Sequence, residues 1–244
     1  MDRRDFFKTA NRTVRTRKAT GKSRAMLFAG LNPYSGPWTV NEVTHLLKRT
    51  MFGAKKADID YFLGLSPDAA VNELLNNSFT PAPPLRDYGL LEDEGVWYDD
   101  LGVLIGQTWV NDPNMASFAG IRGSINSRRV DSLKKWWAGL ILNQQRSIQE
   151  KMVLFWHHHF SIQSTEVENS AMLYRHHNLL RTNALGNFKT LVREVTIDPA
   201  MLIHLNGYLN SKQAPDENYA RELQELFSIG KGNDSLYTED DVIA

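Results

Sequence analysis

The sequence predicts an all-α protein, a multi-helix domain with orthogonal or bundle-like packing and little or no sheet. After residue 122, apolar residues recur at helical spacing almost without a break. Helix-start signals recur along the chain, with Ser or Thr three residues before an acidic residue, or Ser or Asp directly before Pro. No strand-like alternation of useful length follows residue 110.

The helices can be placed in order from their start and stop signals. Thr39 and Glu42 form a capping box for a first helix, and Ser147 with Glu150 forms another for the helix that ends in three histidines. A proline-rich connector over 80–84 and an acidic, aromatic surface loop over 87–100 separate these two regions. The other expected helices cover 55–63, 67–76, 126–145, 169–184, 188–196, 200–205 and 215–230, and a last one begins at Thr238.

By composition the chain divides into a basic N-terminal segment, residues 1–37, and a helical domain, residues 38–244. The formal net charge is zero, yet residues 1–24 carry nine basic and two acidic side chains. We expect this segment to be disordered, although Arg3-Arg4-Asp5-Phe6-Phe7-Lys8 also fits a twin-arginine export signal. If this signal directs export, the expected location is periplasmic or otherwise extracytoplasmic. If it does not, the expected location is the cytoplasm.

Composition excludes several classes of protein. The chain has no cysteine, which rules out disulfides, thiolate metal sites and a cysteine nucleophile. Outside the basic segment the chain is mildly acidic, so nucleic acid is not an expected partner. No apolar run approaches the roughly 18 residues of a membrane-spanning helix, so no transmembrane segment is expected. Phosphate-binding loops, dinucleotide fingerprints and nucleophile elbows are also missing from the sequence.

The most unusual stretch is the apolar helix that ends in His157, His158 and His159. Successive helical residues are rotated by about 100°, so the three imidazoles point in different directions and cannot close on one metal ion. His159 falls on the most apolar face, with Met152 and Phe155, and His157 points almost opposite. If the helix unwinds at His157, residues 157 and 159 share a side and chelation becomes feasible. The alternative is a buried, hydrogen-bonded His159, a partly buried His157 and a solvated His158.

The helix expected over 215–230 carries a polar stripe beside its core stripe of Tyr219, Leu223, Leu226 and Phe227. Carboxylates that face histidines on a neighbouring helix can bind a divalent metal in a helical bundle. The alternative is a buried Glu222 bonded to an Arg or His in an internal network. The His176-His177 pair is expected at packing and surface positions. The candidate metal ligands are His157, His159, Glu222 and Glu225, and the candidate catalytic residues are His157, His159, Arg221 and Glu222.

Four segments stand out in the sequence, residues 151–160, 180–188, 198–202 and 215–227. Taken in this order, they resemble motifs of a bacterial family known only as domain of unknown function 1800. The resemblance covers about residues 38–244, with His158, Asp216 and Gln224 at positions where the family pattern has other residues. It implies no activity, because none is established for the family. Family members are typically longer and many carry export signals, so this chain is expected to be an N-terminal portion truncated at its C-terminus.

Two hypotheses for the function follow. The favoured one is an exported or envelope-associated binding module whose partner is another exported protein or a polymer. The alternative is a metal-dependent or general acid–base enzyme that uses His157 and His159 with Glu222 and Glu225. Geometry separates the two. A histidine nitrogen and a carboxylate oxygen of Glu222 or Glu225 that converge around an open cleft favour the enzyme.

Overall fold

The structure is a computed structural model, which describes residues 32–93, 95–100, 102–112, 122–213, 217–232, 235 and 237–243. Internal contacts separate residues 1–37 from residues 38–244, and each unit is described by itself. The predictions of disorder and of an export signal fall mainly on residues 1–31, outside the described part. The predicted all-α class is confirmed, because helices dominate the described residues and their only sheet is a two-stranded ribbon. None of the described helices is long and apolar enough to cross a membrane.

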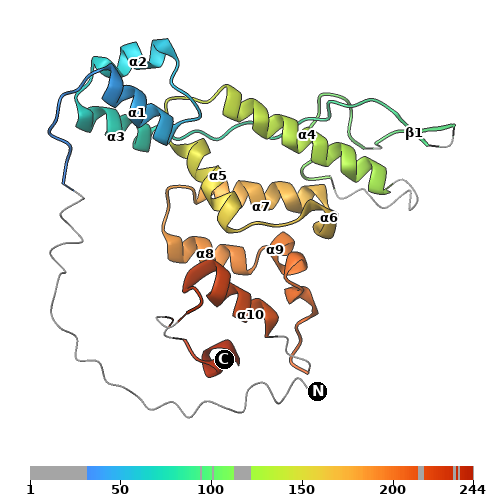
Figure 1. The fold of residues 1–244 in the computed structure, drawn as a ribbon. Coiled ribbons are helices and arrows are strands. Elements are labelled where there is room, and N and C mark those ends of the chain that lie inside the picture. Colours follow the sequence, from blue (N-terminus) through green and yellow to red (C-terminus); the bar gives the residue numbers. More distant parts are fainter. Residues whose placement is uncertain are drawn as a thin grey trace, which may run out of the picture. The chain divides into compact units, whose positions relative to one another are not determined.

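The first three helices enclose a small core of their own (Figure 1). The predicted capping box is confirmed, since the Thr39 N–H donates to Glu42 Oε2 over 2.9 Å and the Thr39 hydroxyl caps the helix. Ser66 caps the third helix by accepting from the Ala69 N–H over 3.2 Å. The helices are α1 (Val40–Thr50), α2 (Lys56–Leu63) and α3 (Pro67–Asn76). Their buried core consists of Val43, Leu47, Met51, Phe62, Ala70 and Leu74.

The segment between α3 and α4 differs from the expected surface loop. Strands β1 (Leu91–Asp93) and β2 (Val96–Tyr98) pair in antiparallel register and leave Trp97 65% exposed. Asp100, at the end of this acidic stretch, is instead only 3% exposed. It is buried because Arg129 of α4 (Arg122–Leu142) donates to both of its carboxylate oxygens. An acidic stretch can therefore reach the core wherever an arginine neutralises one of its members.

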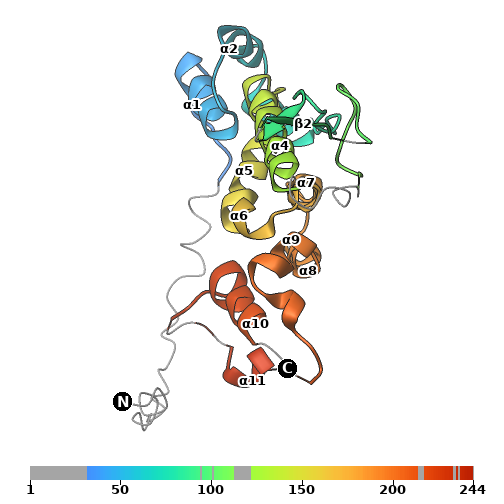
Figure 2. The ribbon, with the colours of Figure 1, turned by 90° about the vertical axis from the view of Figure 1, so that its right-hand side faces the viewer.

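Helix α7 (Ser170–Thr182) is the element against which the following helices pack. It contacts α4 and α5 on one side and α8 and α9 on the other, as the two ribbon views show (Figures 1 and 2). Its buried residues include both polar and apolar side chains, so its packing depends on hydrogen bonds and ion pairs as well as apolar contacts. The other helices of this region are α5 (Gln149–His159), α6 (Ser164–Val167), α8 (Phe188–Thr196) and α9 (Pro199–His204).

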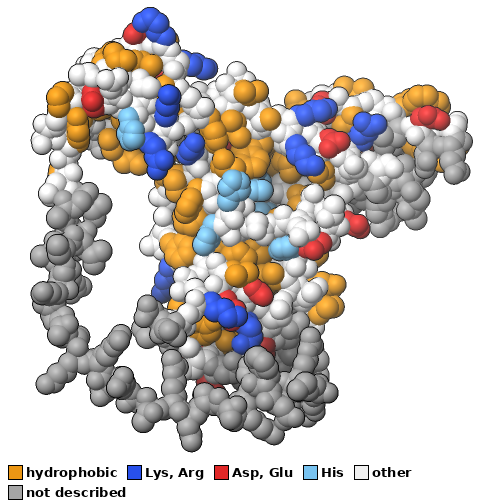
Figure 3. Space-filling model, in the orientation of Figure 1, with side chains coloured by type: hydrophobic (Ala, Val, Ile, Leu, Met, Phe, Trp, Pro, Cys, Tyr) orange, Lys and Arg blue, Asp and Glu red, His pale blue; other side chains and the backbone are white. Residues whose placement is uncertain are grey.

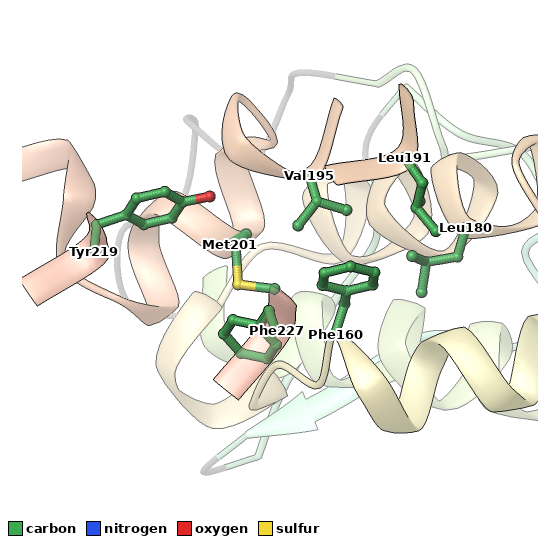
Figure 4. Close-up of a cluster of buried hydrophobic side chains, with 7 residues drawn as sticks. All are labelled: Phe160, Leu180, Leu191, Val195, Met201, Tyr219 and Phe227. Carbon is green, nitrogen blue, oxygen red and sulfur yellow. The ribbon is translucent and has the colours of Figure 1, made fainter. Parts of the chain in front are cut away.

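The last described elements complete a second core, drawn in Figure 4. The single helix predicted over 215–230 is wrong in detail, because a short α-helix continues there as a π-helix. Leu226, predicted as a core residue, is 62% exposed, whereas Phe227 is 6% exposed. These elements are η2 (Gly207–Leu209), α10 (Asn218–Glu222), the π-helix η3 (Leu223–Ser228) and α11 (Glu239–Ile243). The core residues are Phe160, Leu180, Leu191, Val195, Met201, Tyr219 and Phe227.

Candidate functional site

The three adjacent histidines of α5 have three different environments. His158 is exposed, while His157 and His159 are each half-buried. His157 lies against the Trp137 ring of α4, with ring centroids 4.9 Å apart. His159 faces the π-helix and donates from Nε2 to the Phe227 carbonyl oxygen over 2.8 Å. His158 is thus solvated and His159 hydrogen-bonded, as in the structural alternative for the histidine run, but His159 is half-buried rather than buried.

The buried side of α5 is not the side that the hydrophobic pattern predicts. Its buried residues are Gln149, Glu150 and Val153, which lie on the side of His157. Phe155, expected to face the core, is 53% exposed. The predicted capping box is also wrong, because Ile148 is the N-cap residue and makes no side-chain cap. Glu150 is instead committed to a buried ion pair with Arg181.

That ion pair explains why a polar side of α5 faces the core. Both Glu150 carboxylate oxygens accept from the Arg181 guanidinium, and the two side chains are 6% and 3% exposed. A bidentate pair of this kind offsets the cost of burying two charges, which neither residue could bear alone. The Arg181 charge also lies over the Trp136 ring, 5.6 Å from its centroid. The ion pair therefore fixes the register of α5 against α7.

The carboxylates predicted as metal ligands form no hydrogen bond with His157 or His159 in the described part of the chain. Glu225 accepts from Lys231 Nζ over 2.9 Å, and this hydrogen bond lowers the pKa of Glu225 below its usual value. Arg221 donates to Glu217 over 3.2 Å rather than to Glu225. Glu222 is half-buried and has no hydrogen bond or ion pair to any residue that the structure describes. Among those residues, no three His, Asp or Glu side chains are grouped closely enough to hold a metal ion.

A pocket of about 190 Å³ lies where α4, α5 and α7 meet. Its walls are mainly apolar, and polar side chains also line it: Lys134, Trp137, His157, Ser164, His176 and His177. The Trp137 and His177 rings meet edge to face with centroids 4.5 Å apart. Histidine side chains gather over α5 and α7 on the face drawn in Figure 3. His157 is thus the only predicted site residue that lines this pocket within the described part of the chain.

His177 is the residue at this pocket whose hydrogen-bonding needs are unmet. It is 3% exposed, and neither ring nitrogen has a hydrogen-bond partner among the described residues. The Nε1 atom of Trp137 is likewise buried and unpaired in that part of the chain. Burial is the main cause that lowers the pKa of His177 well below its usual value, and the charge of Arg181 adds to it. His177 is therefore a neutral imidazole, with one donor and one acceptor to offer.

His157 is also kept neutral. Burial, followed by the charges of His176 and His158, lowers the pKa of His157 to about 4. Its ring centroid lies 6.4 Å from that of His177. Two neutral imidazoles and an indole N–H therefore share one apolar pocket. Such groups can accept or donate hydrogen bonds at neutral pH without any change of charge.

His176, the third imidazole at the pocket, is fully committed. Its Nδ1 faces Asp198 Oδ2 and its Nε2 faces the Phe160 carbonyl oxygen, each at 3.0 Å. Both ring nitrogens of His176 are therefore engaged by groups within the protein. The same Asp198 oxygen accepts from the Met201 N–H and caps α9. This pair holds α7, α9 and the end of α5 together rather than serving a ligand.

Several residues of this region were missed in the sequence. The His176-His177 pair was assigned to packing and surface positions, yet both rings are buried at a pocket. Their spacing from Leu173 and Leu180 on the apolar face of α7 was the available signal. Trp137 lies on the apolar side of the helix expected over 126–145, and no local signal marks it as a site residue. The pairing of Glu150 with Arg181 had no local signal, because 31 positions separate the two residues.

Comparison with known proteins gives one match. Residues 45–244 match the family described as "Protein of unknown function (DUF1800)". The chain belongs to the DUF1800 family. No curated protein and no solved structure matches it.

The segments that carried the resemblance to DUF1800 are joined by hydrogen bonds in this member. Trp156, in the first segment, donates from Nε1 to the Ala184 carbonyl of the second over 3.0 Å. His159, also in the first, donates to Phe227 in the fourth. Asp198, in the third, is hydrogen-bonded to the His176 ring beside the pocket. The family motifs therefore build the framework of α5, α7 and α9 on which the pocket depends.

Proposed function

We propose that this DUF1800 chain is a binding module whose pocket between α4, α5 and α7 takes a hydroxyl-bearing ring, either a phenol or a sugar. The observation that carries the proposal is the group of unpaired buried polar atoms at the pocket, namely both nitrogens of His177 and Nε1 of Trp137. Buried polar groups in proteins are nearly always hydrogen-bonded. These atoms therefore favour a ligand that reaches them when the two rings turn toward the pocket, because in this structure the atoms are closed to solvent.

The ligand class follows from the chemistry of these atoms. Neutral His177 offers one donor and one acceptor, and Trp137 offers one donor. A hydroxyl group can donate to the imidazole and accept from the indole, and no charge has to enter the apolar pocket. The volume is sufficient, because a cavity of about 150 Å³ accommodates benzene and this pocket measures about 190 Å³. The Trp137 and His157 rings supply aromatic walls for a ring-shaped ligand.

Nuclear magnetic resonance of the indole N–H groups tests the proposal. Titration with phenol, and separately with glucose, should shift the Trp137 indole signal in a saturable way for at least one of the two. The signal is assigned with the Trp137→Phe variant, which keeps an aromatic ring and removes the donor. Trp136 is the matched control, because its Nε1 already donates to the Ala82 carbonyl over 2.8 Å and should not respond. A Trp137 signal that stays unchanged at millimolar concentrations of both probes would refute the proposal.

Export is the second part of the proposed function. We infer that Arg3-Arg4 directs this module out of the cytoplasm, in line with the resemblance of residues 3–8 to a twin-arginine motif. The test is a fusion of residues 1–37 to a reporter that is active only outside the cytoplasm. Activity that disappears in an Arg3→Lys, Arg4→Lys variant supports export, and an inactive wild-type fusion contradicts it.

The second candidate function is a metal-dependent or general acid–base enzyme that uses His157 and His159 with Glu222 and Glu225. One observation favours it, namely the lowered pKa of His157, which leaves a neutral imidazole available as a base or metal ligand. Elemental analysis of the purified chain is the test. Stoichiometric zinc, iron or manganese that is lost in His157→Ala and His159→Ala variants supports this candidate. Metal-free protein of full stability contradicts its metal-dependent form.

A further inference from the structure

A second hollow, of about 400 Å³, lies between the last turn of α1 and α5. It shares no lining residue with the pocket at Trp137 and His177. Its lining includes the cationic Lys48 and Arg49 of α1 and Lys151 of α5, and also Met152, Phe155 and His158 of α5. The hollow therefore combines cationic and apolar walls. Figure 3 shows this combination, with Lys and Arg side chains beside hydrophobic ones over α1 and α5.

The cations at this hollow are not neutralised. Lys48, Arg49 and Lys151 form no ion pair or hydrogen bond with another residue in the described part of the chain. No Asp or Glu is among the residues that line the hollow. The ammonium of Lys151 is held in place, since its Nζ lies 4.6 Å from the centroid of the Phe52 ring. Three positive charges from two helices thus face one cavity without an anionic partner.

Helix stability explains the position of two of these charges and leaves that of Lys151 unexplained. Lys48 and Arg49 lie in the last turn of α1, where the helix dipole favours cations. Lys151, however, lies in the first turn of α5, where the dipole disfavours a cation. The apolar part is similarly unfavourable for a free surface, because Phe155 is 53% exposed. A ligand that carries a negative head and an apolar tail satisfies both parts at once.

We propose that this hollow binds a free fatty acid, with its carboxylate between Lys48, Arg49 and Lys151 and its chain against Met152 and Phe155. The charge complementarity supports an anion, and the apolar wall supports a chain rather than an inorganic ion. The concave shape supports a single molecule, since pockets for small ligands measure about 300–1,000 Å³ and this one measures about 400 Å³. The site is independent of the pocket for a hydroxyl-bearing ring.

Calorimetric titration of the full chain with dodecanoate, below its micelle-forming concentration, tests the proposal. We expect saturable binding that weakens by about tenfold or more in Lys151→Glu and in the double variant Lys48→Gln, Arg49→Gln. It should also weaken as salt rises. Lys189→Gln, an exposed lysine of α8, is the matched control and should bind as the wild type does. Circular dichroism of every variant checks that the fold is kept.

Three outcomes would overturn the proposal. The first is that dodecanoate does not bind to the wild-type chain. The second is that dodecanoate binds equally well to the wild type, to Lys151→Glu and to the double variant Lys48→Gln, Arg49→Gln. The third is binding only to anionic phospholipid vesicles and not to monomeric dodecanoate, which would identify a membrane surface as the occupant instead. The uncharged amphiphile dodecyl maltoside should bind far more weakly than dodecanoate. The variant Trp137→Phe should leave dodecanoate binding unchanged, so failure here and failure of the proposed function are distinguishable.

Discussion

The neutral state of His157 predicts a specific loss of stability at mildly acidic pH. In the folded chain, burial and the charges of His176 and His158 lower the pKa of His157 to about 4. In the unfolded chain the pKa is about 6.5. Between these two values the unfolded state binds more protons than the folded state. The contribution of His157 to the free energy of unfolding is therefore fully present above about pH 6.5. It is lost progressively as the pH falls toward 4.

The size of the effect follows from the two pKa values. A single group that titrates at about 6.5 in the unfolded chain and about 4 in the folded chain removes about 2 kcal/mol of stability at about pH 5. His177 adds to the loss in the same direction, because burial lowers its pKa as well. The substitution His157→Gln removes one of the two titrating groups. We therefore expect the variant to lose about 2 kcal/mol less than the wild type between about pH 8 and pH 5.

Urea unfolding followed by circular dichroism, at several values between pH 8 and pH 5, measures this difference. The comparison uses the change of unfolding free energy with pH, so the cost of the substitution itself at pH 8 cancels. Phe155→Leu is a suitable control, because it alters an exposed position of the same helix without a titratable group. It should show the wild-type pH dependence. Parallel curves for His157→Gln and wild type would refute the assignment of a neutral, half-buried His157.

Other predictions concern the framework of the pocket. Arg181→Met should cost about 3–5 kcal/mol of unfolding free energy, because it leaves the Glu150 charge buried and unpaired. The double variant with Glu150→Leu should regain part of this loss in the same urea assay. Phe160→Ala, at a residue that is 0% exposed, should cost about 3–5 kcal/mol through loss of packing. Thr39→Ala should cost about 1 kcal/mol through loss of the α1 cap, measured as a shift of the urea midpoint.

The parts of the fold that depend on residues close together in the sequence were predictable. The Thr39 and Glu42 box, the Ser66 and Asp198 caps and the helix starts at Pro67 and Pro199 all follow from residues within four positions of each other. The all-α class follows from the same local periodicity. The π-helix was not predictable in this way. The π-helix covers Leu223–Ser228 and follows α10 directly, with more residues per turn than an α-helix. Leu226 is therefore exposed, whereas a regular helix would place it on the core side.

The candidate site was predicted only in part. The sequence singled out His157, which lines the pocket, but placed Glu222 and Glu225 near it, whereas Glu225 pairs with Lys231. The unpaired His177 and Trp137 come from two other helices, and only their tertiary packing shows that they share a cavity. A metal role for the predicted residues stays a prediction. The residues that define the pocket are thus those whose local pattern looks like ordinary helix packing.

The orientation of α5 shows why hydrophobicity alone misplaced the site. Its apolar pattern favours the side of Met152, Phe155 and His159, yet the side of Glu150 and His157 is the one that packs against the core. A buried carboxylate is costly unless a cation reaches it, and Arg181 of α7 does so with two hydrogen bonds. Once that pair forms, His157 faces Trp137 and His177 rather than solvent. The location of the pocket therefore depends on an ion pair between distant positions, which no single helix can reveal.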